Sequence, residues 1–177
     1  MAVPALKGEA RFSPTALWAI VGVSLLLLNG VRRLAPIALQ PFSRGLGPLG
    51  WAAYVASGLF FAYCEGYRGF QMKFSPLVVR RALLLSGPQP THRHIMAPAY
   101  AMAFFHATPK RKRTSCMLIA IMISLVVVVK RMPYPARSII DAGVCVGLAW
   151  GIASLAVIFT QAVRTGRAPE VDPCLPA

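Results

Sequence analysis

The stretch AGVCVGLAWGIASLAVIFTQAV, residues 142–163, decides the expected fold, because it contains 22 consecutive residues without a charged side chain. About 20 predominantly apolar residues are enough for an α-helix to cross the hydrocarbon core of a bilayer. Charged residues bound the stretch, with Arg137 and Asp141 before it and Arg164 after it. The sequence therefore predicts that this segment spans a membrane.

Three further apolar blocks precede it, and the chain as a whole is 56% apolar, above the roughly 45–50% typical of soluble domains. The third block is short, at about 15 residues or about 22 Å of helix. Lys130 and Arg131 can extend it by reaching the headgroups with their long side chains. We therefore expect an all-α, polytopic integral membrane protein with four transmembrane helices. The predicted spans cover residues 14–31, 46–64, 115–131 and 138–163.

The net charge of +14 raises the question of nucleic acid binding, but the basic residues flank apolar blocks, as in membrane proteins whose cytoplasmic loops are rich in Lys and Arg. With four spans, 13 of the 19 basic residues lie on the side that holds both termini and the central loop. A fifth span at His94–His106 would divide them ten to nine and remove the bias. We therefore predict no nucleic acid partner, and both termini on the cytoplasmic or an equivalent side.

The predicted domain organisation is simple. Residues 1–13 form a polar N-terminal tail, residues 14–164 a single transmembrane helical domain, and residues 165–177 a C-terminal tail. We expect the first apolar block to be retained, because NGVRR follows it in place of a small-residue cleavage site. The four cysteines have no paired spacing that would indicate a disulfide framework.

Short interfacial helices are expected in the central loop, at about residues 75–86 and 94–107. In the first, Ser75 is a candidate N-cap, and Arg80 and Arg81 form a cationic face suited to anionic lipid headgroups. The alternative is a helix packed on the spans. The second segment has about 11 apolar residues and contains Pro98, which favours an interfacial or re-entrant position over a span.

A run of four cations abuts the third span. In the simplest interpretation it anchors the topology, and in the alternative it contacts anionic lipid or an acidic partner. The run consists of Lys110, Arg111, Lys112 and Arg113.

The stretch FFAYCEGYRGF, residues 60–70, places Glu65 and Arg68 at the end of the second apolar block, close to Tyr63 and Tyr67. Residues three apart on an α-helix are neighbours, and tyrosines collect at membrane interfaces. We therefore expect Glu65 and Arg68 to form an interfacial ion pair. The alternative is that Glu65 carries protons, since a charge at membrane depth is a functional candidate by default.

Small residues repeat every fourth position in the last span, at Gly143, Gly147 and Gly151. Such a face lets helix backbones approach closely in lipid. It predicts helix packing, either within this chain or with a partner or second copy. Asp141 follows Arg137 by four residues, and this neighbouring cation accounts for the acid without invoking catalysis.

No pattern of catalytic residues is found in the sequence. His92, His94 and His106 are weak candidates for a metal site, because no carboxylate lies nearby in sequence to orient an imidazole ring. We expect no cofactor and lean towards a protein that is not an enzyme. The leading hypothesis is a structural, assembly or accessory subunit of a membrane complex. The alternatives are a small oligomeric transporter or channel and, third, a membrane enzyme acting on lipid headgroups.

Overall fold

The computed structural model describes residues 13–85, 95–102 and 127–171. Of these residues 85% are helical, and none of them forms a strand, which confirms the all-α prediction. The helices are α1 (Pro14–Ala38), α2 (Gln40–Arg44), α3 (Pro48–Phe61), the π-helix η1 (Ala62–Phe74), α4 (Ser75–Leu84), α6 (Ala97–Ala101) and α8 (Ala136–Thr165).

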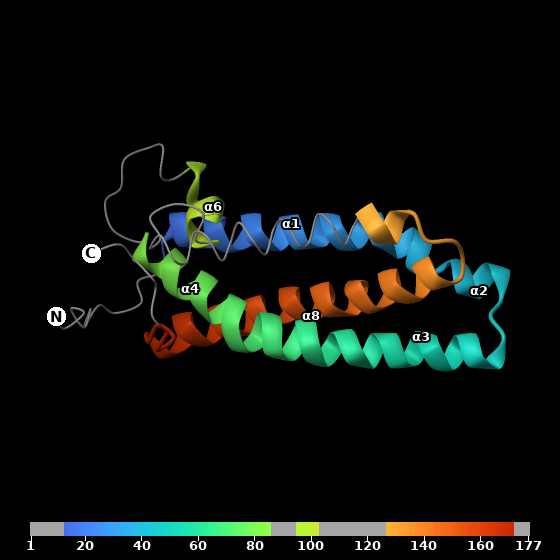
Figure 1. Cartoon of the computed structure of the whole chain (residues 1–177). Helices are drawn as coiled ribbons and strands as arrows, with labels where there is room; N and C mark the ends of the chain where they lie inside the picture. The colour runs from blue at the N-terminus through green and yellow to red at the C-terminus, as the bar shows by residue number, and fades with distance from the viewer. Residues whose placement is uncertain (1–12, 86–94, 103–126, 172–177) are drawn as a thin grey trace.

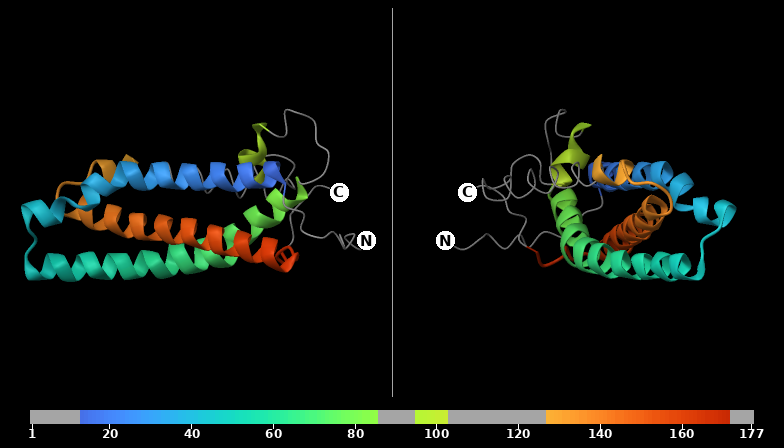
Figure 2. Two further views of the ribbon diagram at one scale, coloured as in Figure 1. Left: turned by 180° about the vertical axis from the view of Figure 1, so that it is seen from behind. Right: turned by 45° about the vertical axis from the view of Figure 1, so that its right-hand side comes forward.

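Three long helical rods lie side by side: α1, the continuous run α3–η1–α4, and α8 (Figures 1 and 2). Helix α1 runs antiparallel to α8, since a Cβ atom at Gly30 would meet Leu148 while Ile20 shares an apolar cavity with Phe159. The α3–η1–α4 rod runs parallel to α8. The start of α1 and the end of α8 therefore lie at the same end of the bundle.

Local sequence explains where these rods begin and end. The Ser13 hydroxyl accepts a hydrogen bond from the Thr15 amide (3.2 Å), and Pro14 occupies the first turn of α1, where its missing N–H costs nothing. Helix α8 ends at Thr165 and is capped by Gly166, whose φ of 66° suits a residue without a Cβ atom. Helix α1 extends beyond the first predicted span, past residue 31 and through Pro36 to Ala38.

Two helices are long and apolar enough to cross a membrane by length and composition: Pro14–Arg44, with 31 residues, and Ala136–Thr165, with 30. They contain the first and last predicted spans, residues 14–31 and 138–163. The second predicted span falls on α3, which is only 14 residues long because the backbone changes to a π-helix at Ala62. Of the third predicted span, residues 115–131, the structure describes only residues 127–131.

The main apolar core lies at the end of the bundle where α1 begins and α8 ends. It is built from small and medium side chains of α1, α4, α6 and α8, whose buried members include Val23, Val78, Ala101 and Leu155. At the opposite end, the segment before α8 contacts α2: the Arg44 guanidinium lies 5.5 Å from the centroid of the Tyr134 ring, and the Tyr134 hydroxyl donates to the Gly45 carbonyl. Contacts at both ends therefore hold the rods in register.

Candidate functional site

The glycine face of α8 packs against the α3–η1 rod. A Cβ atom at Gly147 would lie 2.7 Å from Glu65 Oε2, and one at Gly151 would lie 2.7 Å from Phe70 Cγ. A Cβ atom at Gly143 would collide with Phe61. These glycines are all buried, so the stripe serves packing within the chain, which is one of the two roles predicted for it.

The side chains that cover these glycines reveal a change of helical register. Phe61 and Glu65 are four residues apart, but Glu65 and Phe70 are five apart. A π-helix bonds residue i to i+5 and takes up one more residue per turn, and π-helical turns often occur at functional sites. The winding of η1 therefore lets both Glu65 and Phe70 face α8.

Glu65 is the one acidic side chain of η1, and its carboxylate points at α8. Its Oε2 atom is buried and has no hydrogen-bond partner in the described part of the chain. Arg68 is exposed, and no ion pair joins it to Glu65 among the described residues. The expected ion pair is thus absent, because it assumed α-helical winding, in which residues three apart are neighbours. In the wider π-helix they diverge.

The structure also changes the expected level of Glu65 in the bundle. Glu65 lies beside Gly147, which is five residues inside the charge-free stretch 142–163 of α8, or about 8 Å from the start of that stretch. The sequence had suggested a position at the boundary, next to Tyr63 and Tyr67. These rings do stack on each other, with centroids 6.1 Å apart, but on the exposed side of η1.

A short series of polar contacts continues from Glu65 along the same interface. The Trp150 indole donates to Gln71 Oε1 (2.9 Å), and the hydroxyls of Ser75 and Ser154 are 2.8 Å apart and buried. Ser154 also donates to the Gly151 carbonyl (3.0 Å). Sequence reasoning assigned Ser75 to a helix cap, whereas it lies within a continuous helix. Its pairing with Ser154 could not be found, because 79 residues separate the two in sequence.

Arg81 has a different place from the predicted one. Its side chain is 0% exposed, its Nε donates to the Tyr100 carbonyl (2.8 Å), and its guanidinium lies 4.7 Å from the Tyr100 ring centroid. Arg80 is half-buried and donates to the Pro169 carbonyl (3.2 Å). The prediction that Arg81 belongs to a cationic face on anionic headgroups is therefore wrong, because its side chain lies inside the bundle. The contacts of α4 with α1, α6 and α8 favour the alternative of a helix packed on the spans.

The predicted neighbours Arg137 and Asp141 do meet. Arg137 Nε lies 3.6 Å from Asp141 Oδ2, and the Asp141 side chain is 5% exposed. This pair lies in the first turns of α8, about 9 Å along the helix from Gly147. Glu65 and Asp141 accordingly belong to separate sites.

Several candidate residues fall outside the described ranges. The three histidines, His92, His94 and His106, and the cation run Lys110–Arg113 are among them. Within residues 13–85, 95–102 and 127–171, no group of three or more His, Cys, Asp or Glu side chains could hold a metal ion.

Comparison with protein-family models, with curated proteins and with solved structures gave no match for this chain. The functional argument therefore rests on the geometry of the site. The Glu65 carboxyl is an ionisable group at this interface, and it is held against the α8 backbone at Gly147. In the described part of the chain, no second acid, base or nucleophile pairs with it.

Proposed function

We propose that this chain is a small multi-pass membrane protein that acts as a non-catalytic structural, assembly or accessory subunit of a membrane complex. The observation that carries the proposal is the distribution of side chains on α8. This helix buries mainly small residues such as Gly143 and Gly147, with Leu155 and Phe159 beside them, and exposes Trp150 and Val157. Soluble proteins bury large apolar groups, whereas membrane helices pack through small residues and present large apolar ones to lipid or to partner helices.

Helix α3 supports the same conclusion. None of its 14 residues is buried, and four of them are large apolar residues that are at least 57% exposed: Leu49, Val55, Leu59 and Phe60. A contiguous apolar surface of this kind marks a membrane or protein interaction site. Contact with lipid or with another subunit would stabilise this exposed surface of α3.

We further propose four spans, with both termini on the cytoplasmic or equivalent side. The start of α1 and the end of α8 lie at the same end of the bundle, which supports an even number of membrane crossings. The excess of Lys and Arg expected on that side supports the orientation, and it remains 11 to 6 when Arg68 and Lys73 of η1 are left out of the count.

Cysteine-accessibility labelling in intact membranes tests this topology. Cys174 and a cysteine introduced by the substitution Lys112→Cys should react from the same side, because both belong to the predicted cytoplasmic side. Leu49→Cys, at the opposite end of the bundle, is the matched control and should react from the other side. Labelling of positions 112 and 174 from opposite sides would eliminate the four-span arrangement.

Native mass spectrometry of the protein extracted from its own membrane tests the assembly role. A defined complex with other subunits is the expected result. A complex of identical copies alone would contradict it and would favour a small transporter or channel, since four helices enclose little space for a pathway.

Proton-linked transport is the second candidate, and the position of Glu65 favours it. An ionisable residue within a membrane segment that faces the bundle interior, without a neutralising partner, is typical of proton carriers. This candidate needs the same fold as the first and differs from it only in the role of one carboxyl group.

The substitution Glu65→Gln separates the two candidates. It keeps the shape of the side chain and removes its charge, so we expect the free energy of unfolding to change by about 1 kcal/mol or less. Arg68→Ala should leave it within about 0.5 kcal/mol, because Arg68 is exposed and unpaired with Glu65. Proton flux into liposomes that contain the protein is measured with a pH-sensitive dye.

If Glu65 serves only packing, wild type and the Glu65→Gln variant should show the same background flux. A flux in wild type that vanishes in a normally folded Glu65→Gln variant would promote the transport candidate. A large loss of stability in Arg68→Ala would contradict the separation of the two side chains.

A further inference from the structure

The outward side of η1 carries charges at an unexpected level. Gln71 bonds Trp150, Phe70 packs on Gly151, and Ser75 bonds Ser154. These contacts set residues 70–75 level with residues 150–154 of α8, at the centre of the charge-free stretch 142–163. Because Glu65 lies level with Gly147, Arg68 and Lys73 fall between the levels of residues 147 and 154. If α8 spans a membrane, η1 crosses the bilayer at mid-depth.

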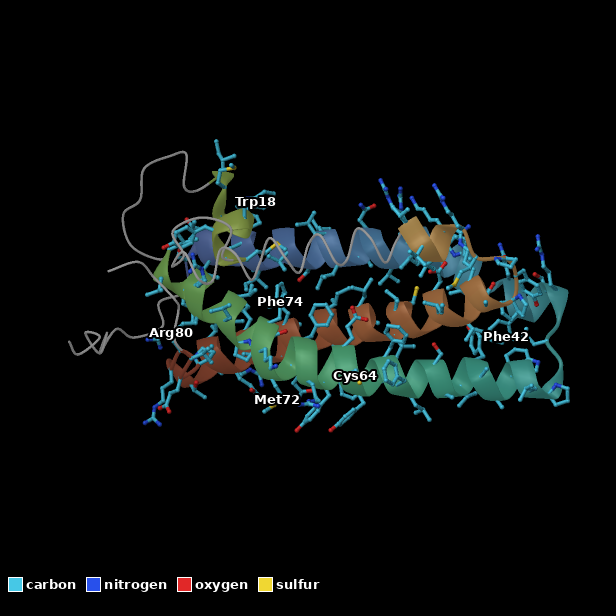
Figure 3. All side chains as sticks on the ribbon, in the orientation of Figure 1. Trp18, Phe42, Cys64, Met72, Phe74 and Arg80 are labelled. Carbon is cyan, nitrogen blue, oxygen red and sulfur yellow. The ribbon has the colours of Figure 1, made fainter. Side chains whose placement is uncertain are left out.

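Six exposed side chains define the η1 outer face. They occur as three adjacent pairs that recur every four or five residues, and the winding of η1 brings these pairs to one side, opposite the residues that contact α8. Figure 3 shows Met72 on the side of the ribbon away from α1, and Phe74 between the rods. The η1 outer face consists of Tyr63, Cys64, Tyr67, Arg68, Met72 and Lys73.

Neither cation of this face has an anionic neighbour in the described part of the chain. The described residues form an ion pair between Arg137 and Asp141, which lies at the start of α8. A charged side chain at the centre of a bilayer is energetically costly, and such groups pair with other groups or face water or protein. Two of them on one exposed face therefore require a partner.

We propose that the η1 outer face is a docking surface for a membrane-embedded helix of a different protein that carries acidic side chains at mid-membrane. Charge complementarity assigns the acids to the partner, and the exposed tyrosines supply amphipathic contact area beside them. The inference rests on the proposed membrane location. It specifies the chemistry of the partner with which an accessory subunit would assemble.

A second copy of this chain fits the face poorly. Three of its five acidic residues belong to the described part of the chain: Glu170 follows the end of α8, Asp141 neighbours Arg137 near the start of α8, and Glu65 faces Gly147. None of these three is positioned to meet Arg68 and Lys73 from outside at the centre of α8, and Glu9 and Asp172 lie outside the described residues.

A photocrosslinking amino acid at position 72, in the full-length protein and in the cells that make it, tests the proposal. A probe at Val157, which is 53% exposed on α8, is the matched control. Each probe is combined with the neutral double variant Arg68→Gln/Lys73→Gln and with the charge-preserving Arg68→Lys/Lys73→Arg. Crosslinked peptides are identified by mass spectrometry.

We expect the position-72 crosslink to map to an apolar segment of about 18 residues or more that contains Asp or Glu. Its yield should fall at least tenfold in the neutral variant and persist in the charge-preserving one, while the control crosslink stays unchanged. Crosslinks only to lipid or to a second copy, or a yield unaffected by the neutral variant, would overturn the docking surface. Release of the protein from membranes by alkaline carbonate would instead overturn the membrane location itself.

Discussion

Gly147→Leu is expected to lower the free energy of unfolding by about 3 kcal/mol, near the upper end of what overpacking costs. Even a single Cβ atom at this position would lie 2.7 Å from Glu65 Oε2 and 3.2 Å from Glu65 Cβ. A leucine side chain would either separate the η1 and α8 backbones or force Glu65 out of the interface. Thermal unfolding in detergent, together with migration on size-exclusion chromatography, measures the effect.

Gly58→Leu is the matched control for this prediction. Gly58 is also a helical glycine in an apolar segment, but a Cβ atom there would meet nothing within 4 Å. Leucine also has a higher helix propensity than glycine, by up to about 1 kcal/mol. Gly58→Leu should therefore leave stability unchanged or raise it. Equal melting temperatures for the two variants would mean that the glycine stripe does not face η1.

Arg81→Ala is expected to cost a similar amount, about 3 kcal/mol. The guanidinium donates to the Tyr100 carbonyl, and a hydrogen bond to a charged group contributes about 1.5–3 kcal/mol. Its position over the Tyr100 ring adds about 1 kcal/mol, because the cation is shielded from water. Loss of this side chain should also release α6 from α4, which increased proteolysis near residues 95–102 would detect.

The adjacent Arg80→Ala variant is the control for this substitution. Arg80 is half-buried and its described contact is a single 3.2 Å hydrogen bond to the Pro169 carbonyl, so a loss of about 1 kcal/mol or less is expected. If Arg80 and Arg81 were equivalent members of a lipid-facing cationic surface, the two variants would instead have similar, small effects on stability and similar effects on binding to anionic vesicles.

Glu65 illustrates how the candidate site escaped prediction from sequence. The pairing with Arg68 was predicted from α-helical spacing, and only the winding of η1 separates the two residues. A run of small and aromatic residues such as YCEGYRGF carries no recognised sequence signal for a π-helix. The level of Glu65 within the bundle depends on contacts with α8, about 80 residues further along the chain, which periodicity cannot supply.

Arg81 illustrates the same limit for a short helix. On a helical projection it lies beside Arg80 and away from the apolar arc, so exposure was the natural expectation. The structure packs α4 on three sides, against α1, α6 and α8, and the backbone carbonyl of Tyr100 supplies the acceptor that makes burial of the guanidinium tolerable. The sequence contains no signal that pairs these two residues.

The sequence by itself determined the helical class, the apolar character of α1 and α8, and the presence of a small-residue face on α8. These properties depend on composition and on spacing within one segment, so local residues are sufficient to establish them. Only the tertiary structure decided which rod covers that face, that Glu65 rather than an apolar residue meets Gly147, and that Arg81 lies inside while Arg68 and Lys73 lie outside. Those outcomes depend on how η1 winds and on contacts between segments far apart in the chain, and neither is specified by any local pattern.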